Sequence, residues 1–312
     1  MSYVYVGSAA WPRDAAGAAR GAVVVIGNFD GVHRGHRAVL ARANALAADR
    51  ALACVVYTFD PAPTSVVAPQ RHQPRISTLA DRVARLAAAG ADAVVIEPFT
   101  AAWAAHPARW FAEEVLGRRL GARAVIVGHD FRFGANRAGD AASLRAWMPA
   151  LDVIEVPAYE SDGSPISSSR VRRLVAEGDV ASAAELLGRP HELVGTVVQG
   201  DQRGRTIGFP TANLLTETEL TPADGVYAGT VRVDDGPEIL PAVTNVGVRP
   251  TVDGGGRRTI EVHLLDWQGD LYGRALRFAC VARLRGERRF PSIDALRAQI
   301  VDDVAAARRV LG

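Results

Sequence analysis

Two histidines stand where an apolar run gives way to a helical pattern, a position that suits phosphate chemistry. The run Val23–Ile26 is followed by Gly27-Asn-Phe-Asp-Gly-Val-His33-Arg-Gly-His36. The N-terminus of a helix carries unpaired N–H groups and a partial positive charge, and both attract anions. Two imidazoles at such a terminus can face a phosphate, and the glycines of the segment allow close backbone approach. The simpler alternative is a tight turn with two histidines facing solvent.

Two further segments of the first half carry side chains that suit nucleotide or flavin binding. Gly128-His-Asp-Phe-Arg-Phe-Gly134 follows the apolar run Ala124–Val127 and is too rich in glycine and aromatic residues for an ordinary connection. Ile166-Ser-Ser-Ser-Arg-Val-Arg172 places three hydroxyls and two guanidinium groups at the start of a helix, which suits a second phosphate site. The simpler alternatives are core phenylalanines in the first segment and capping of a helix by one serine in the second.

The second half contains a glycine-rich segment that leads into paired polar residues. Glycines at 200, 204 and 208 make a flexible loop whose amides can approach phosphate. Thr211 and Asn213 then alternate on one face of a strand, where a hydroxyl and an amide oxygen can ligate Mg²⁺. An ordinary strand entered through a glycine turn is the simpler alternative.

A strand of alternating character carries the candidate base. In residues 259–265 the apolar side chains face one way, while Glu261 and His263 face the other. A carboxylate within reach of a hydroxyl can act as a general base, so Glu261 is a candidate for that role; a surface glutamate is the alternative. We expect His263 to be structural, and residues 245–251 to form a turn.

The elements that position these residues change character along the chain. The first half alternates strands with helices, which predicts a parallel sheet with helices on both faces and ligands beyond the C-terminal strand ends. Its expected strands are 23–26, 54–59, 93–96, 124–127 and 152–156, and its expected helices 35–50, 81–89, 107–120 and 141–148. Two short helices follow up to residue 187. Short strands at 193–198, 225–233, 240–246, 259–265 and 276–284 then predict an all-β barrel or sandwich, closed by a helix over 292–311 with Ser292 as its cap.

Composition excludes several classes of function. All 36 basic residues of the chain are arginine, so no lysine can form a Schiff base or a P-loop clamp. The length of 312 residues predicts two domains. The net charge of +2 argues against general nucleic-acid binding. Two cysteines, Cys54 and Cys280, cannot make a disulfide framework, and we expect Cys54 to be buried. With no signal peptide and no membrane-spanning run, the sequence predicts a cytoplasmic protein without membrane contact and leaves the oligomeric state unknown.

With these motifs, residues 1–187 resemble the adenylyltransferase module of the bacterial bifunctional riboflavin kinase/FAD synthetases, an α/β Rossmann-like module of the HxGH nucleotidyltransferase superfamily. The resemblance implies that His33 and His36 bind the phosphates of ATP and stabilise the charge on the α-phosphate and the departing pyrophosphate. It places further ATP contacts at Gly27, Asn28, Phe29 and Asp30 and at the second motif, Ser168, Ser169 and Arg170. It places a polar residue of the flavin or adenine site at Asp130, and we expect Asp130, Phe131 and Phe133 to contact the flavin. The phosphate of FMN would attack the α-phosphate directly.

Residues 190–312 resemble the riboflavin kinase module of the same enzymes. The resemblance lies in Gly208-Phe-Pro-Thr-Ala-Asn213 and in Ile260-Glu-Val-His followed by Asp270-Leu-Tyr-Gly273. It implies a six-stranded antiparallel barrel with a C-terminal helix, in which Thr211 and Asn213 hold Mg²⁺ and, with Gly208, the phosphates of ATP. Glu261 would take the proton from the ribityl 5′-hydroxyl.

We therefore expect an enzyme that converts riboflavin and ATP to FMN, and FMN and ATP to FAD and pyrophosphate, with Mg²⁺ in both steps. One position departs from the pattern: the family reads Phe-Asp-Pro-His-Pro where this chain has Phe59-Asp-Pro-Ala62-Pro63. Ala62 motivates the alternative of a riboflavin kinase with an impaired adenylyltransferase. A flavin-sensing binding protein and a nucleotidyltransferase for another phosphate acceptor are the remaining alternatives.

Overall fold

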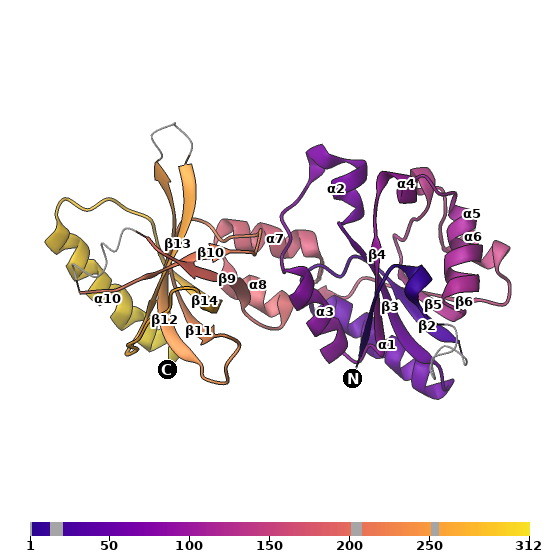
Figure 1. Cartoon of the computed structure of the whole chain (residues 1–312), viewed down its shortest axis with the longest axis horizontal. Helices are drawn as coiled ribbons and strands as arrows, with labels where there is room; N and C mark the ends of the chain where they lie inside the picture. Colours follow the sequence, from indigo (N-terminus) through magenta and orange to yellow (C-terminus); the bar gives the residue numbers. More distant parts are fainter. Residues whose placement is uncertain (1, 13–20, 201–207, 251–255) are drawn as a thin grey trace. The chain divides into compact units, whose positions relative to one another are not determined.

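The computed structural model describes residues 2–12, 21–200, 208–250 and 256–312 (Figure 1). Contacts between Cα atoms divide the chain into two compact units. Unit 1 comprises Met1–Gln73 and Leu79–Ser167, and unit 2 comprises Pro74–Thr78 and Ser168–Gly312. The second half of unit 1 therefore begins only after a short segment that belongs to unit 2. The sequence-based boundary between residues 187 and 190 stays a prediction.

Unit 1 is built on a six-stranded parallel sheet in the order β1-β4-β3-β2-β5-β6, which confirms the predicted architecture. The strands are β1 Tyr3–Val6, β2 Ala22–Ile26, β3 Ala53–Asp60, β4 Ala93–Pro98, β5 Ala122–Gly128 and β6 Asp152–Val156. All five residues of β2 are buried, as expected of a central strand covered on both faces. The edge strand β1 was not predicted, because most of its side chains are exposed and lack the pattern of a half-buried strand.

Helices cover both faces of this sheet, and each face has its own core. One core joins Val24, Val55 and Val125 to the segment Phe111–Leu120, and the other joins Val25 and Val56 to Leu40 and Leu86. The main helices are α1 Arg34–Asp49, α3 Leu79–Ala88, α5 Ala108–Trp110 with η4 Phe111–Arg119, and α6 Ala141–Trp147. Shorter elements are η1 Ser8–Ala10, α2 Pro63–Val67, η3 Pro69–Arg71, α4 Ala101–Ala104, η5 Ala135–Arg137, β7 Glu160–Ser161 and β8 Ser164–Pro165.

Unit 2 is a closed antiparallel barrel in the order β10-β13-β12-β11-β14-β9, which confirms the barrel and excludes the sandwich. Its strands are β9 His191–Val198, β10 Ala212–Thr216, β11 Gly225–Val233, β12 Leu240–Pro250, β13 Gly256–Leu264 and β14 Ala275–Gly286. The turn expected at residues 245–251 is wrong: these residues continue β12 as far as Pro250, and Thr251 lies outside the described residues.

Three helices in the described part of unit 2 accompany the barrel. α7 Ser168–Glu177 and α8 Val180–Leu187 precede it, and α8 ends at Gly188 in the left-handed conformation (φ 67°) that glycine accepts without strain. The last helix, α10 Ile293–Leu311, begins where predicted: the Ser292 hydroxyl accepts a hydrogen bond from the Ala295 N–H at 3.1 Å. Its Ala307 packs in a small core with Val226 and Val243 of the barrel.

The short segment Pro74–Thr78 is fixed to unit 2 by several polar contacts. The N–H of Arg75 donates to Glu219 Oε2 at 2.9 Å, and its carbonyl accepts from the Leu220 N–H at 3.1 Å. The Arg172 side chain of α7 donates to the Pro74 carbonyl at 2.9 Å. Segment 74–78 thus joins α7 to the connection between β10 and β11.

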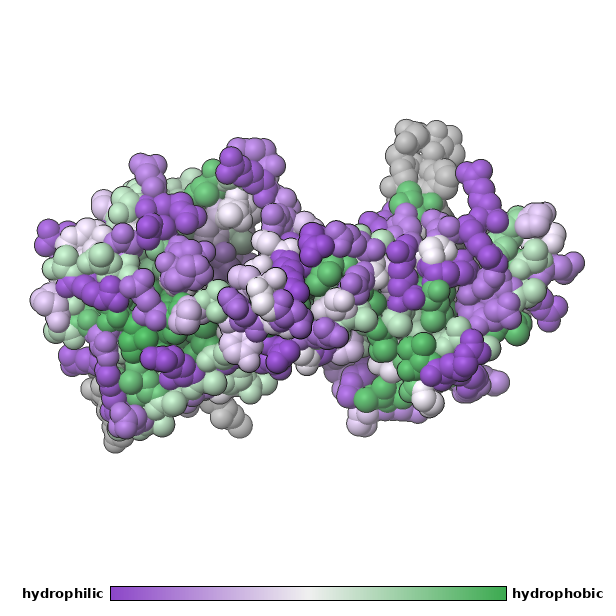
Figure 2. All heavy atoms as spheres, turned by 180° about the vertical axis from the view of Figure 1, so that it is seen from behind, coloured by the Kyte–Doolittle hydropathy of each residue, from purple (hydrophilic) through white to green (hydrophobic). Residues whose placement is uncertain are grey.

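None of the helices in the described part of the chain combines the length and the apolar character that crossing a bilayer requires. Figure 2 shows hydrophilic side chains on the visible surface of each unit, and apolar side chains are interspersed among them.

Candidate active sites in the two units

The two histidines of the first motif lie where β2 passes into α1. His33 is the N-cap of α1, and its Nδ1 accepts a hydrogen bond from the His36 N–H at 3.2 Å. The two imidazole rings stack with their centroids 3.6 Å apart, and the Phe29 ring meets His36 edge-on at 5.2 Å. A Cβ at Gly35 would lie 3.2 Å from the His33 ring, so glycine lets that ring lie close to the backbone. The structure thus brings His33 and His36 together at a helix N-terminus.

The environment of His36 favours the neutral imidazole. Burial, and secondarily the neighbouring His33, hold the pKa of His36 well below 6.5. Its Nδ1 is buried and has no hydrogen-bond partner among the described residues, although the side chain as a whole is half-buried. A neutral ring beside a helix N-terminus can donate one N–H to an anion.

The loop before His33 is folded tightly. Phe29, Gly31 and Val32 all have positive φ values, of 51°, 78° and 42°. This conformation is rare for a β-branched residue such as Val32 and marks a backbone that its surroundings must hold. Of the predicted ATP contacts, Asn28 is exposed, whereas Phe29 and Asp30 are buried.

The other motif loops of unit 1 extend from the same edge of the sheet. Strands β3 and β5 flank β2 and run parallel to it, so their C-terminal ends meet beside the histidine loop. β3 ends in Phe59-Asp60, and Ala62 follows as the half-buried N-cap of α2, without a side-chain capping bond. β5 ends at Gly128, before the aromatic loop.

The three predicted flavin contacts have different surroundings. Asp130 is exposed, and Phe131 is half-buried and stacks on Phe133 with centroids 5.2 Å apart. Phe133 is 8% exposed and also packs against Phe111 and Trp147. Phe131 is therefore the more accessible ring, and Phe133 supports it from the core.

The hydroxyl-rich motif begins α7. Ser168 and Arg170 are half-buried and Ser169 is exposed. Ser168 is the first residue of α7 and of the second segment of unit 2, whereas the two histidines belong to unit 1.

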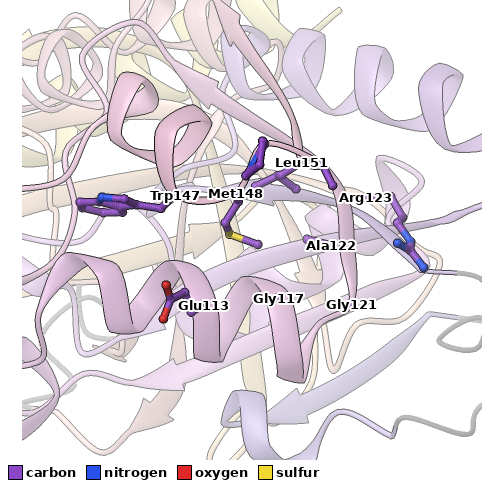
Figure 3. A pocket seen from close by; sticks show the side chains of 10 residues that line it. Glu113, Gly117, Gly121, Ala122, Arg123, Trp147, Met148 and Leu151 are labelled. Atoms are coloured by element: carbon purple, nitrogen blue, oxygen red, sulfur yellow. The ribbon is translucent and has the colours of Figure 1, made fainter.

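One cavity of unit 1 is at the opposite end of the sheet from the motif loops. It has a volume of about 460 Å³, and Figure 3 shows Trp147, Met148 and Leu151 around it together with Arg123 and Glu113. Ala122 of its lining begins β5, whereas the aromatic loop follows the end of that strand. None of the predicted site residues lines this cavity. We assign the site by the chemistry at the C-terminal strand ends, where parallel sheets bind their ligands.

A row of polar residues crosses the outer face of the barrel. Asn213 of β10 is paired with Glu261 of β13, and Glu261 is paired with Asn245 of β12. Directly paired residues of antiparallel strands share a face, and the neighbours Ala212, Ile260 and Val246 point into the core. The predicted residues Asn213 and Glu261 are thus adjacent. The expected alternation of apolar and polar side chains along β13 is confirmed.

The segment that leads into β10 is attached to β13. The carbonyl of Pro210 lies 2.7 Å from His263 Nδ1, and the rings of Phe209 and His263 meet edge-on at 5.6 Å. This agrees with a structural role for His263. Gly208 is exposed with φ 89°, and Thr211 is half-buried. Gly204 of the predicted glycine loop lies outside the described residues.

Gly200 lies against the polar row from the side of β9. A Cβ at this position would overlap the Asn213 side-chain amide, so only glycine leaves room for that amide. The approach of this segment's backbone amides to phosphate stays a prediction.

Sequence reasoning missed two residues that contribute to these sites. Asn245 was assigned to a turn, although it extends the polar row. Arg82 lies in the helix predicted over residues 81–89 and received no role there, although its buried side chain contacts the loop after β2 and the end of β3. The available signal was a charged residue in line with Leu79, Val83 and Leu86 on the apolar face of a helix.

The described part of the chain holds no cluster of three or more His, Cys, Asp or Glu residues that could bind a metal ion. The oxygen donors of Thr211, Asn213 and Glu261 are a different kind of set, suited to a hard cation that also binds phosphate.

A parallel α/β unit with a histidine pair at its first helix and a β-barrel with a carboxylate–amide row define an enzyme with two phosphate-transfer modules. Comparison with known proteins agrees. The family model for FAD synthetase matches residues 16–170, and the model for riboflavin kinase matches residues 187–311. The chain belongs to the bifunctional riboflavin kinase/FMN adenylyltransferase family.

Relatives of known name match over nearly the whole chain. The bifunctional riboflavin kinase/FMN adenylyltransferase of Escherichia coli K12 is 42% identical over 94% of this chain and 93% of its own length. That of Pseudomonas fluorescens is 40% identical over 93% of each chain. A crystal structure described as a macrolide-efflux protein from Streptococcus pneumoniae has a TM-score of 0.87 and 32% identity and covers 98% of both chains, which shows the shared fold.

Proposed function

We propose that each unit performs one of the two reactions of the family through the residues described above. The chain is a riboflavin kinase and an FMN adenylyltransferase. In our proposal the barrel transfers the terminal phosphate of ATP to riboflavin and yields FMN. Unit 1 transfers AMP from a second ATP to FMN and yields FAD and pyrophosphate.

The pairing of Asn213 with Glu261 carries the assignment in the barrel. The Glu261 carboxylate takes the proton of the ribityl 5′-hydroxyl, whose oxygen attacks the γ-phosphorus of ATP, and ADP leaves. Asn213 orients the phosphate beside this base through its side-chain amide. Thr211 and Gly208 contribute a hydroxyl and a backbone N–H to the same polyphosphate.

The donor set of the barrel fits Mg²⁺, because a hydroxyl, an amide oxygen and a carboxylate are the hard oxygen donors this ion prefers. We propose Thr211 and Asn213 as the residues that hold it. When bound, it supplies charge neutralisation on the polyphosphate. The protein residues then have only to orient the riboflavin hydroxyl and accept its proton.

The stacked pair of His33 and His36 at the start of α1 carries the assignment in unit 1. An oxygen of the FMN phosphate attacks the α-phosphorus of ATP, and the bond to pyrophosphate breaks. No residue forms a covalent intermediate, so catalysis depends on positioning and on donors aimed at the developing charge. Because the His36 ring is neutral, it contributes an N–H donor, while the loop from Gly27 to Asp30 contributes backbone groups.

The remaining assignments are predictions at single residues. Asp130 and Phe131 contact the flavin of FMN, with Phe133 behind them. Ser168, Ser169 and Arg170 contact the phosphates of ATP. The prediction of a cytoplasmic enzyme that binds neither nucleic acid nor membrane also stands as a proposal.

A second candidate function follows from Ala62. With alanine at the position where the family reads histidine, FAD synthesis could be so slow that the chain acts as a riboflavin kinase. The loss of one polar contact in such a site can lower a rate by about 10²–10³-fold.

The test is a time course with riboflavin, ATP and Mg²⁺, in which riboflavin, FMN and FAD are separated by chromatography. We expect FMN first and FAD later. Glu261→Gln should stop FMN formation and leave conversion of added FMN to FAD intact. His36→Ala should do the reverse, so each variant is the control for the other. Accumulation of FMN without FAD, even from added FMN, would support the second candidate.

A further inference from the structure

Arg82 is a buried cation that connects the ends of two strands. Its side chain is 4% exposed and comes from the first turn of α3. Nη1 donates to the Asn28 carbonyl at 3.1 Å, and Nη2 donates to the Phe59 carbonyl at 2.9 Å. The carboxylate of Asp60 lies 3.5 Å from Nη2. One guanidinium thus holds the histidine loop that follows β2 to the end of β3.

The Asn28 carbonyl has a second buried donor. The hydroxyl of Thr58, which is fully buried on β3, donates to the same oxygen at 3.2 Å. Two donors on one carbonyl occupy both of its lone pairs and fix its direction. The carbonyl therefore points toward β3 and α3.

The orientation of this carbonyl determines that of the next N–H. In a trans peptide unit the C=O and the N–H point in opposite directions. Among the described residues the only cis peptide bond is Asp60–Pro61, so the bond between Asn28 and Phe29 is trans. The Phe29 N–H therefore points away from Arg82 and Thr58. Within the described residues it donates to no backbone or side-chain acceptor. An N–H of this kind, just before the N-terminus of α1, is available to an anion.

The backbone at this point would not hold its conformation unaided. Phe29 has a φ of 51° and Val32 a φ of 42°, and residues with side chains adopt this region at a cost. Fixing the Asn28 carbonyl restrains the peptide unit that begins this strained stretch. A fixed peptide unit needs no reorganisation when charge develops on a bound phosphate.

We propose that Arg82 is a positioning residue for adenylyl transfer: by holding the Asn28 carbonyl with Thr58, it directs the Phe29 N–H toward the phosphates of ATP. The inference rests on the proposed nucleotide site at His33 and His36. Arg82 acts through the peptide unit between Asn28 and Phe29, and it leaves the chemistry of the barrel unaffected.

The decisive variant is Arg82→Met, which keeps the length of the side chain and removes its donors. We expect kcat/KM for ATP in FAD formation to fall about tenfold or more, because misplacement of a positioned group has effects of this size. The kcat/KM for FMN formation by the same sample should stay within about twofold. Arg82→Lys should recover part of the loss, since an ammonium group can donate to both carbonyls. Arg42→Met, at an exposed position of α1, is the matched control.

Thr58→Val supplies a second test that does not remove a charge from the core. It should also lower kcat/KM for ATP in FAD formation, by a smaller factor than Arg82→Met. If Arg82→Met does not fold, the Thr58→Val result decides, and an unchanged kcat/KM for ATP would overturn the proposal.

A purely structural Arg82 would give a different pattern. The melting temperature of Arg82→Met would fall, while kcat/KM for ATP measured well below that temperature would equal that of the wild type; this result would also overturn the proposal. His36→Ala keeps this test separate from that of the proposed function. If His36→Ala makes FAD normally, the nucleotide site itself is wrongly placed, whatever Arg82 does.

Discussion

Asn213 and Glu261 face each other on neighbouring strands of the barrel, although 48 positions separate them in the sequence, the difference between their residue numbers. The pairing puts an amide and a carboxylate side by side on the outer face of a rigid sheet, where neither depends on a loop for its position. Gly200 completes the arrangement, because it leaves space for the Asn213 amide.

The first prediction concerns that space. Gly200→Ala should force the Asn213 amide to move and lower riboflavin kinase kcat by about tenfold, because small displacements of a positioned group reduce catalysis strongly. FAD formation from added FMN should not change. Steady-state rates of both reactions on one sample test this. In a chain that already carries Asn213→Ala, Gly200→Ala should not lower the kinase kcat further. Equal kinase rates for wild type and Gly200→Ala would contradict the role given to Asn213.

The second prediction concerns acid stability. The pKa of His36 in the folded chain lies below its ordinary value of 6.5, so below pH 6.5 the unfolded chain binds a proton that the folded chain does not. The free energy of unfolding should therefore fall as the pH decreases through 6.5, by at most about 1.4 kcal/mol per pH unit from this residue. Denaturant unfolding between pH 5 and pH 8 should show a smaller slope for His36→Gln. An identical slope would show that His36 titrates normally.

The third prediction concerns Ala62. Because Ala62 caps α2 just beyond the end of β3, Ala62→His should add a polar group at the edge of the sheet that carries the histidine pair. We expect faster FAD formation and an unchanged kinase rate. Ala68→His, at the other end of the same short helix, is the control. If Ala62→His leaves FAD formation as it was, the departure from the family pattern has no catalytic consequence.

The fourth prediction concerns the two thiols. Burial, and secondarily Asp92, raise the pKa of Cys54 to about 12, and burial raises the pKa of Cys280 as well. At pH 8 neither residue has an appreciable thiolate fraction, so neither should react with a disulfide reagent in the folded chain. Both should react after unfolding in denaturant. Rapid reaction of one thiol in the native protein would mean that its region opens readily.

Local patterns predicted much of the fold. The apolar run of β2 predicted the strand that leads into the histidine loop. The helical spacing of Leu40, Ala43 and Ala47 predicted α1, because a helix buries side chains at intervals of three to four residues. The edge strand β1 was missed, since Tyr3, Val4 and Val6 are exposed and an edge strand needs no buried face. A long continuous strand was mistaken for a turn at Asn245 because glycine and proline follow it.

Pairings between distant residues could not be predicted in the same way. The register that aligns Asn245, Glu261 and Asn213 arises from closure of the barrel, which no local window contains. Arg82 reaches carbonyls 54 and 23 residues away, and a backbone carbonyl has no signature in the sequence. The motif residues themselves were visible as residue types, while their mutual contacts were not.

Segment 74–78 matters when the kinase unit is to be produced without the rest of the chain. A fragment that starts after Leu187 would encode all six barrel strands and the last helix. It would lack Arg75, so the Glu219 carboxylate and the Leu220 N–H would lose partners that lie some 144 residues earlier in the chain. A kinase produced from such a fragment would therefore differ from the natural one at the connection between β10 and β11, and supplying the missing stretch as a separate peptide would be the way to restore it.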